Sequence, residues 1–418
     1  MSEAQTIGAH SRSVTAQPAP RTLPAWVYRH PELNEIEYEQ LFRPSWQFAC
    51  HVSQVQRPRE FVTLDMMSDS IIVMRGDDGV LRAMMNVCRH RASRILDGSG
   101  TCKARLTCRY HGWTYNLQGE LVGRPAEQTF SGAAKSELGL RQVELEILCG
   151  MVFVRLVPGG PSLKEMWKDC IHMLEPYRLE EMVPLGEPSV DTWNCNWKVG
   201  VDNNLENYHV PIGHPGYDRM LESDMAGFIN AHGVAGSRSV LRKTPSRLWS
   251  ERMYQQMAPR LNQDLPEDIR SSWLFFTMPP NIGIDIYGDS FDLFQFMPLT
   301  AQTCTVRYPI FVRPNASRDM KILRYLNVRV NRQVSAEDKY LCEGIQGGLN
   351  SVGYEFGPLS SWEHCIHDFH DRVRSGCPVT TLASAPDEGT LRQHNQAMLK
   401  ARAASAGPGA GHRSLTVI

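Results

Sequence analysis

Two short stretches decide the fold: CRHR at residues 88–91 and CRYHGWTY at residues 108–115. Their potential ligands follow the spacing C-x-H, then 17 residues, then C-x-x-H. Each stretch supplies one thiol and one imidazole, the side chains that transition metals prefer. The four candidate ligands are Cys88, His90, Cys108 and His111.

Two thiolates and two imidazoles suit either zinc or a Rieske [2Fe–2S] cluster, in which two cysteines hold one iron and two histidines hold the other. Zinc fingers usually keep both cysteines in one loop and both histidines in a helix. Here each loop gives one of each, and turn sequences at 77–79 and 118–119 indicate hairpins beside them. Gly112 would allow close approach of the backbone to sulfur. This alternation favours two equivalent loops around a two-iron cluster over zinc or over ordinary buried residues.

The composition excludes several classes of protein. The 418 residues carry a net charge of −1, which gives no basic bias toward nucleic acid or anionic lipid. The apolar run at 71–74 is far too short to span a membrane, and the N-terminal residues lack the order of a signal peptide. The odd count of eleven cysteines disfavours a secreted disulfide framework. We therefore expect a cytoplasmic protein.

The order of strand-like and helix-like segments along the chain predicts an α+β protein of two intergrown domains. Strand-like segments dominate up to Pro158–Gly159–Gly160, and helix-like segments near 162–182, 196–210 and 335–350 follow. The predicted division is a flexible tail at 1–28, a small β domain at 46–157, a larger domain at 29–45 and 158–400, and a second tail at 401–418.

A second group of polar residues lies in NWKVGVDNNLENYHVPIGHPGY, residues 196–217. Asp202, Glu206 and His209 are spaced to share one face of a helix, which Pro211 should end or kink. His214 follows from the next loop. Two histidines and one carboxylate form the facial triad of non-haem iron(II) sites, which leaves positions open for dioxygen and substrate.

A third candidate is Asp338, in SAEDKYLCEGIQGGL from Ser335. Its spacing from Leu341, Ile345 and Leu349 places it in line with the apolar stripe of a helix, where a carboxylate needs a partner. A metal ion is one such partner. A capping box from Ser335 to Asp338 at a helix start explains the pattern equally well, and Glu337 is a competing ligand candidate.

Together these motifs resemble the Rieske non-haem iron oxygenases, the ring-hydroxylating enzymes and their relatives. The resemblance extends from about residue 30 to about residue 375 and implies a Rieske β domain joined to a helix-grip catalytic domain. It implies that His209, His214 and Asp338 bind mononuclear Fe(II), with Asn203 near the iron. It also implies that Glu206 links His209 to the Rieske ligand His111 of a neighbouring subunit, in a homotrimer.

The same resemblance implies a separate reductase, and in some systems a ferredoxin, that delivers electrons from NAD(P)H. The chain itself has no G-x-G-x-x-G fingerprint in a βαβ context. The expected partners are a small organic substrate and O2, with neither nucleic acid nor a membrane.

The carboxylate at 206 bears on the reaction, because many ring dioxygenases have Asp where this chain has Glu206. The Glu form resembles carnitine, stachydrine and glycine betaine oxygenases, which favours monooxygenation or oxidative N- or O-dealkylation. A cis-dihydroxylating aromatic dioxygenase is the alternative, and a non-catalytic Rieske electron carrier is a remote one. The aromatic residues of 271–280, with Phe291, Phe294 and Phe296, are candidates for an apolar pocket or for core.

Overall fold

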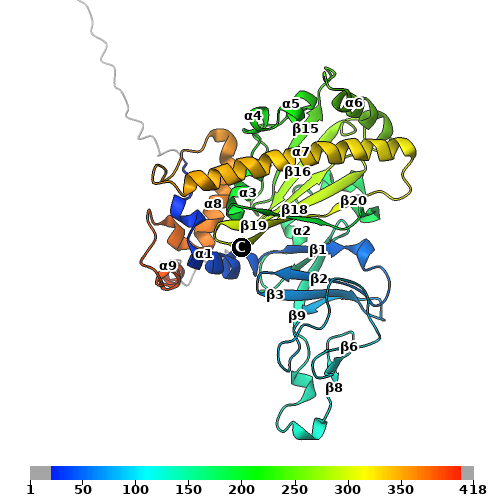
Figure 1. Cartoon of the computed structure of the whole chain (residues 1–418), viewed down its shortest axis with the longest axis vertical. Helices are drawn as coiled ribbons and strands as arrows, with labels where there is room; N and C mark the ends of the chain where they lie inside the picture. The colour runs from blue at the N-terminus through cyan, green and yellow to red at the C-terminus, as the bar shows by residue number, and fades with distance from the viewer. Residues whose placement is uncertain (1–19, 406–418) are drawn as a thin grey trace, which may run out of the picture.

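A computed structural model describes residues 20–405 and contains two large antiparallel sheets and a small third one, with most helices around the second large sheet (Figure 1). The edge strand β1 of the first large sheet contacts the second. The first sheet has seven strands in the order β1-β10-β9-β4-β3-β2-β5. Its strands are β1 Gln47–His51, β2 Glu60–Met66, β3 Asp69–Arg75, β4 Leu81–Met85, β5 Ser99–Thr101, β9 Gln142–Leu148 and β10 Met151–Arg155. A small sheet of β6 Leu106–Thr107, β7 Thr114–Tyr115 and β8 Leu121–Gly123 extends from it.

Two hairpins shape this β domain, and both turns were predicted from sequence. Gly79 has a φ of 77° in the turn between β3 and β4, a left-handed conformation that glycine adopts without strain. In the turn between β7 and β8, the side chain of Asn116 accepts hydrogen bonds from the N–H groups of Gln118 (3.1 Å) and Glu120 (2.8 Å). The hairpins place the loops at 88–93 and 108–113 side by side.

The second sheet has ten strands, and its main path runs β11-β20-β18-β17-β16-β15-β13, with β12 joined through β19 and β14 through β15. The strands are β11 Val183–Pro184, β12 Ser189–Trp193, β13 Leu221–Ser223, β14 Phe228–Ile229, β15 Ala235–Leu241, β16 Ser272–Met278, β17 Ile282–Ile286, β18 Ser290–Thr300, β19 Thr303–Tyr308 and β20 Ile310–Val312. The central strands β16 to β18 are almost fully buried, since helices cover one face and the core lies on the other.

The long helix α7, Arg318–Leu349, crosses this sheet and produces the predicted helix-grip arrangement (Figure 1). The other helices are α1 Pro31–Glu37, α2 Leu163–Trp167, α3 Trp197–Asn204, α4 Val210–Gly213, α5 Pro215–Met220, α6 Trp249–Leu261, α8 His364–Gly376 and α9 Leu391–Ser405. The predicted α+β class is therefore confirmed.

Three sequence expectations need correction. The helix expected at 162–182 is only α2 followed by short 3-10 turns. The helix with Asp338 does not begin at Ser335: it begins after Ser317, whose Oγ accepts from the Met320 N–H at 3.1 Å. The single helix expected at 196–210 stops at Asn204, and a separate short helix, α4, follows with Pro211 in its first turn, where proline is tolerated.

The predicted tails lie mostly outside the described residues, but their inner ends are ordered. Residues Ala25–Tyr28 form a 3-10 helix, and Trp26, Val27 and Tyr28 are buried, because apolar side chains gain free energy by leaving water. Residues 401–405 belong to α9. Both ordered segments pack on the side of the second sheet where α1 and α8 lie (Figure 1).

Candidate metal centres

The two cysteine–histidine loops have the same backbone conformation. In each loop the cysteine N–H donates to the carbonyl five residues later, and the cysteine carbonyl accepts from the N–H four residues later. These bonds join Cys88 to Ser93 (2.9 Å) and Ala92 (3.0 Å), and Cys108 to Trp113 (2.8 Å) and Gly112 (3.0 Å). The fourth residue is left-handed in both, with φ of 58° at Ala92 and 70° at Gly112. The loops are therefore structurally equivalent, as their alternating residues predicted.

The four candidate ligands of the cluster converge between these loops. Cys88 and Cys108 are each only 2% exposed, and the rings of His90 and His111 lie 4.5 Å apart, with His111 exposed. The buried Nδ1 of His90 has no hydrogen-bond partner, as expected of an atom that binds a metal. The residues fit a [2Fe–2S] cluster with its thiolates inward and its imidazoles at the surface.

Two aromatic residues of the second loop and of β7 support this site. The indole of Trp113 stacks on His90, with centroids 4.8 Å apart and an interplanar angle of 7°, which fixes the orientation of that imidazole. The hydroxyl of Tyr115 lies 3.3 Å from Cys88 Sγ and can donate to a thiolate there. Hydrogen bonds to ligand sulfur tune the potential of an iron–sulfur cluster.

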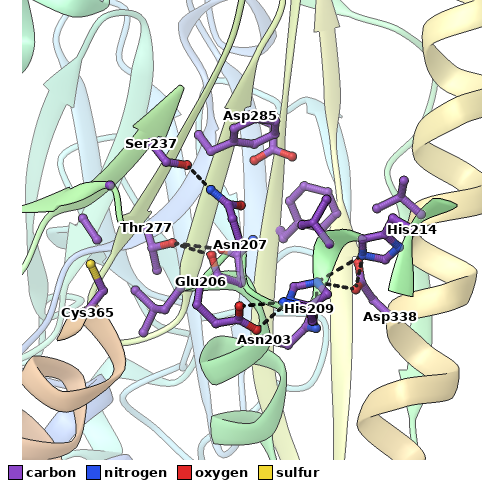
Figure 2. A pocket seen from close by; sticks show the side chains of 18 of the residues that line it. Asn203, Glu206, Asn207, His209, His214, Ser237, Thr277, Asp285, Asp338 and Cys365 are labelled. Carbon is purple, nitrogen blue, oxygen red and sulfur yellow. Dashed lines mark hydrogen bonds and ion pairs between the residues drawn. The ribbon is translucent and has the colours of Figure 1, made fainter. Parts of the chain in front are cut away.

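The second centre joins three residues from separate helical segments. His209 precedes α4, His214 lies between α4 and α5, and Asp338 extends from α7, and one ligand atom from each falls within 4.8 Å of the others. Nε2 of His214 lies 2.9 Å from Oδ1 of Asp338 and 3.1 Å from Nε2 of His209. The buried Oδ1 of Asp338 nevertheless makes no hydrogen bond of acceptable geometry. A carboxylate oxygen without a hydrogen bond, beside two imidazole nitrogens, fits an iron(II) site (Figure 2).

A glutamate holds the outer nitrogen of each histidine. Oε1 of Glu206 lies 2.5 Å from Nδ1 of His209, and its Oε2 accepts from the His209 backbone N–H at 3.0 Å. Oε2 of Glu337 lies 2.9 Å from Nδ1 of His214. Such contacts orient each ring so that Nε2 faces the metal. The structure thus places Glu337 at the outer nitrogen of His214, away from the metal position. Asp338 instead lies beside the Nε2 atoms of both histidines.

The electrostatics of the centre also favour a cation. Burial alone would lower the pKa of His209, but the carboxylates of Asp338 and Glu206 outweigh it and raise the pKa to about 9. The same competition, with Asp338 and Glu337 as the anions, raises the pKa of His214. The concentration of partly buried carboxylates beside two imidazoles suits a divalent ion.

Two polar residues of α3 have different positions. Nδ2 of Asn203 lies 3.4 Å from Nε2 of His209, so Asn203 adjoins the metal position as the resemblance implied. Asp202 was expected on the same face as Glu206 and His209, and this is wrong because α3 ends between them. Instead Asp202 accepts from the hydroxyl of Tyr28 at 2.9 Å and contacts His370 at 2.9 Å.

The centre opens into a pocket with a cavity volume of about 110 Å³, which leaves room only for a small ligand. Figure 2 shows His209, His214 and Asp338 on one side of this pocket and Asp285 farther along its wall. Of the aromatic residues considered from sequence, Phe275, Phe294 and Phe296 line the pocket, whereas Phe291 belongs to the core.

Family models match both parts of the chain. Residues 45–143 match the Rieske [2Fe-2S] domain, and residues 174–378 match the ring hydroxylating alpha subunit (catalytic domain). The chain belongs to the Rieske non-haem iron oxygenases. The cofactors of this Rieske oxygenase are accordingly a [2Fe–2S] cluster and a mononuclear iron.

Known Rieske oxygenases align with nearly the whole described chain. The chloroplastic choline monooxygenase of Arabidopsis thaliana is 27% identical over 363 residues, 84% of this chain and 81% of that protein. The carnitine monooxygenase oxygenase subunit of Acinetobacter pittii is 29% identical over 349 residues, 80% of this chain and 86% of that one. A solved quaternary ammonium Rieske monooxygenase, CntA, is 25% identical with a TM-score of 0.72, and the alignment covers 86% of this chain and 96% of that one.

Within one chain of this Rieske oxygenase, the two centres lie at opposite ends. The cluster loops adjoin β6 and β7 at one end, and the candidate iron ligands flank α4 or belong to α7, helices that lie at the other end (Figure 1). No helix in residues 20–405 combines the length and apolar character needed to cross a membrane.

Among the pocket residues that the sequence analysis did not single out is an acid, Asp285 on β17. Its signal was present in IGIDI at 282–286, a single acid within an otherwise apolar strand. A carboxylate in such a strand is buried with its neighbours and needs a partner or a role.

Proposed function

We propose that this oxygenase hydroxylates a C–H bond next to nitrogen in a small N-methylated ammonium compound, and that the adduct loses the methyl group as formaldehyde. The observation that carries the proposal is the opening of the His209–His214–Asp338 group into a pocket of suitable size. The names of the choline and carnitine monooxygenases, and of the quaternary ammonium monooxygenase CntA, support the substrate class.

The side chains around the iron position would have three different roles. His209, His214 and Asp338 would hold the iron, and Glu206 and Glu337 would keep the two imidazoles aligned. When bound, the iron supplies dioxygen activation with electrons from the Rieske cluster. The amide of Asn203 adjoins the open side of this site, where it can donate to an oxygen atom.

We further propose that electrons enter each iron site from a neighbouring subunit of a homotrimer. The separation of the two centres in one chain supports this, as does the inter-subunit electron transfer described for a solved quaternary ammonium Rieske monooxygenase. Glu206 would connect His209 to the neighbour's exposed cluster histidine. A separate NAD(P)H-dependent reductase, directly or through a ferredoxin, would supply electrons to the cluster. The eleven unpaired cysteines of the described residues agree with a cytoplasmic setting.

A single-turnover reaction tests the proposal. Reduced, iron-loaded protein is mixed with isotopically labelled dioxygen and either N-methyl ammonium compounds or aromatic hydrocarbons. One labelled oxygen in the product, or labelled formaldehyde, is expected from the N-methyl compounds. Two labelled oxygens on an aromatic ring would instead make the protein a ring dioxygenase.

A matched pair of variants on α7 ties that activity to the proposed centre. Asp338→Ala should lose the mononuclear iron and the product, while Asp319→Ala, at an exposed position of the same helix, should keep both.

A further inference from the structure

Asp285 is a buried carboxylate that faces the substrate pocket without a full set of partners. Only 7% of the residue is exposed, and its Oδ1 makes no hydrogen bond within the described residues. It lines the same pocket as the iron ligand Asp338 (Figure 2). An unpartnered buried carboxylate costs free energy, and native structures rarely keep one without a functional reason.

A second buried acid of this sheet, Asp292, has the hydrogen-bond partners that Asp285 lacks. Asp292 lies directly opposite Asp285 in the pairing of β17 with β18, and it is equally buried. Asp292 accepts hydrogen bonds from the Tyr287 hydroxyl (3.3 Å) and from Asn331 Nδ2 (3.4 Å), and it does not line the pocket. Of the two acids, only Asp285 is open to a ligand.

The surroundings of Asp285 add to the cost of its charge. Burial and the neighbouring carboxylate of Asp292 raise the pKa of Asp285 well above its ordinary value. A cationic ligand would relieve this cost, because an opposite charge nearby stabilises the ionised carboxylate.

The rest of the wall suits a cation of low hydration. Tyr217, Phe275 and Phe294 line the pocket, and aromatic faces attract ammonium groups. A methylated ammonium group presents apolar methyls and a diffuse positive charge, so it gains from rings and from a carboxylate together.

The pocket offers no cationic side chain to a carboxylate group of a ligand. Among the described residues that line it there is no lysine or arginine, whereas Glu206, Asp285 and Asp338 are all acids. When a ligand's cation stabilises ionised Asp285, the three carboxylates exceed the two positive charges of a ferrous ion by one negative charge. The anionic end of a zwitterionic betaine would therefore meet like charge.

We propose that Asp285 binds the cationic nitrogen of the substrate and selects N-methyl cations that lack a carboxylate, such as choline, over zwitterionic betaines. This inference rests on the proposed function, since it names the residue and the subclass of substrate for the same pocket.

Binding calorimetry on the iron-loaded, unreduced protein tests the inference without turnover. Three ligands of similar shape are compared: choline, its neutral isostere 3,3-dimethylbutan-1-ol, and glycine betaine. We expect choline to bind roughly ten- to hundredfold more tightly than the isostere, the range for a charge-assisted contact in a desolvated site. Glycine betaine should bind more weakly than choline. Equal binding of choline and the isostere by the wild-type protein would overturn the inference.

Two isosteric variants assign the selectivity to a residue. Asp285→Asn should reduce the preference for choline over the isostere to less than about threefold. Asp292→Asn removes an equally buried acid outside the pocket and also the charge that disfavours ionised Asp285, so it should keep the wild-type ratio or raise it. An Asp285→Asn protein that keeps the full preference would refute the role of Asp285. If that variant cannot be purified, the ratio measured on wild-type protein still decides whether the pocket selects a cation.

Thermal melting separates recognition from a structural role. Without ligand, Asp285→Asn should melt at the wild-type temperature or above it, because the change replaces a buried carboxyl group that lacks a full set of partners by an amide of the same shape. A large fall in melting temperature would mean that the carboxylate serves the fold, contrary to the inference.

The inference and the proposed function can fail separately. If choline binds with the expected preference but no N-methyl compound yields labelled product, the cation site stands and the proposed reaction falls. If N-methyl compounds are oxidised while the neutral isostere binds equally well, the reaction stands and the role of Asp285 falls.

Discussion

Oε2 of Glu337 lies 2.9 Å from Nδ1 of His214, while Oδ1 of the next residue, Asp338, lies 2.9 Å from Nε2 of the same ring. Two consecutive acids of α7 thus hold opposite edges of one imidazole. Consecutive helical residues point about 100° apart, which is why a single ring can meet both. The second oxygen of Glu337 accepts from Gln333 Nε2 at 2.9 Å, which fixes the outer carboxylate.

This arrangement predicts that Asp338→Asn and Glu337→Gln differ in their effect on iron. Asp338→Asn should abolish binding of the mononuclear iron, because the amide replaces a charged ligand. Glu337→Gln should retain the iron with a roughly 10- to 100-fold loss of affinity, as is typical when a group behind a ligating histidine is changed. Iron content of the two purified variants, measured at increasing chelator concentration, gives the affinity for the mononuclear iron. The iron of the Rieske cluster, whose four ligands are unchanged, provides an internal reference. The reverse ranking would make Glu337 the ligand.

The equivalence of the cluster loops predicts opposite effects of two small substitutions. Gly112→Ala puts a Cβ at a φ of 70° and within 3.3 Å of Pro125 Cγ, so we expect a loss of about 1–2 kcal/mol in stability. Ala92 already has a side chain at a left-handed φ of 58°, and Ala92→Gly removes that strain. This substitution should therefore stabilise the loop or leave its stability unchanged. Thermal loss of the cluster's visible absorption measures both variants. A destabilising Ala92→Gly would show that the two loops do not carry the same strain.

The distance between the centres predicts complementation between damaged subunits. Cys108→Ser should remove the cluster and Asp338→Ala the mononuclear iron, so each variant alone should be inactive. Co-expressed as mixed trimers, they should recover about one quarter of the wild-type activity per subunit, since random assembly places an intact iron site beside an intact cluster in about that fraction. Activity after separate purification and mixing provides the control for subunit exchange. Complete absence of recovery in verified mixed oligomers would point to electron transfer within one chain.

His51 predicts an acid-sensitive contribution to stability. Burial lowers its pKa from 6.5 to about 4, and its Nε2 bonds to the Leu179 carbonyl at 3.1 Å. Above pH 6.5 the imidazole is neutral in the folded and unfolded states, so it contributes no pH dependence. As the pH falls from 6.5 toward 4, only the unfolded state gains the proton, and about 3 kcal/mol of stability is lost.

The test of this prediction is urea unfolding at pH 7 and at pH 4.5. His51→Gln lacks the titrating group, so its stability should fall less between the two pH values than that of the wild type. Equal losses in the two proteins would exclude His51 as the source. His232→Gln, at a partly buried histidine with a hydrogen-bonded backbone N–H, serves as the matched control.

The sequence alone indicated all four candidate cluster ligands, because they are close together in the chain and the hairpins that present them have local turn signals. The fold class followed from the same local patterns. Asp338 was harder to recognise: its helix starts directly after Ser317, well before Ser335, so the apparent capping box was a coincidence of spacing. Ser335 in fact donates to the Tyr308 hydroxyl at 3.1 Å.

Other features depended on tertiary structure and left little local signal. The break after Asn204 turns Asp202 toward Tyr28 and His370, two residues more than 160 positions away in the chain, and no local pattern reveals them. The same holds for Asp285, whose significance depends on which face of β17 meets the pocket. Strand alternation alone cannot separate that face from the side of the core.

The length of α7 has a consequence for how this chain can vary. Asn331, which contacts Asp292 behind the pocket wall, and Asp338, which faces the iron position, are separated by seven residues, close to two full turns or about 10.5 Å. Inserting or deleting one residue between them would turn one side chain about 100° away from its partner. The irregular segment at 350–360 has no such periodicity and can change length without disturbing either contact. Related chains that diverge widely in sequence should therefore keep this interval of α7 at constant length, and place their insertions after the helix ends.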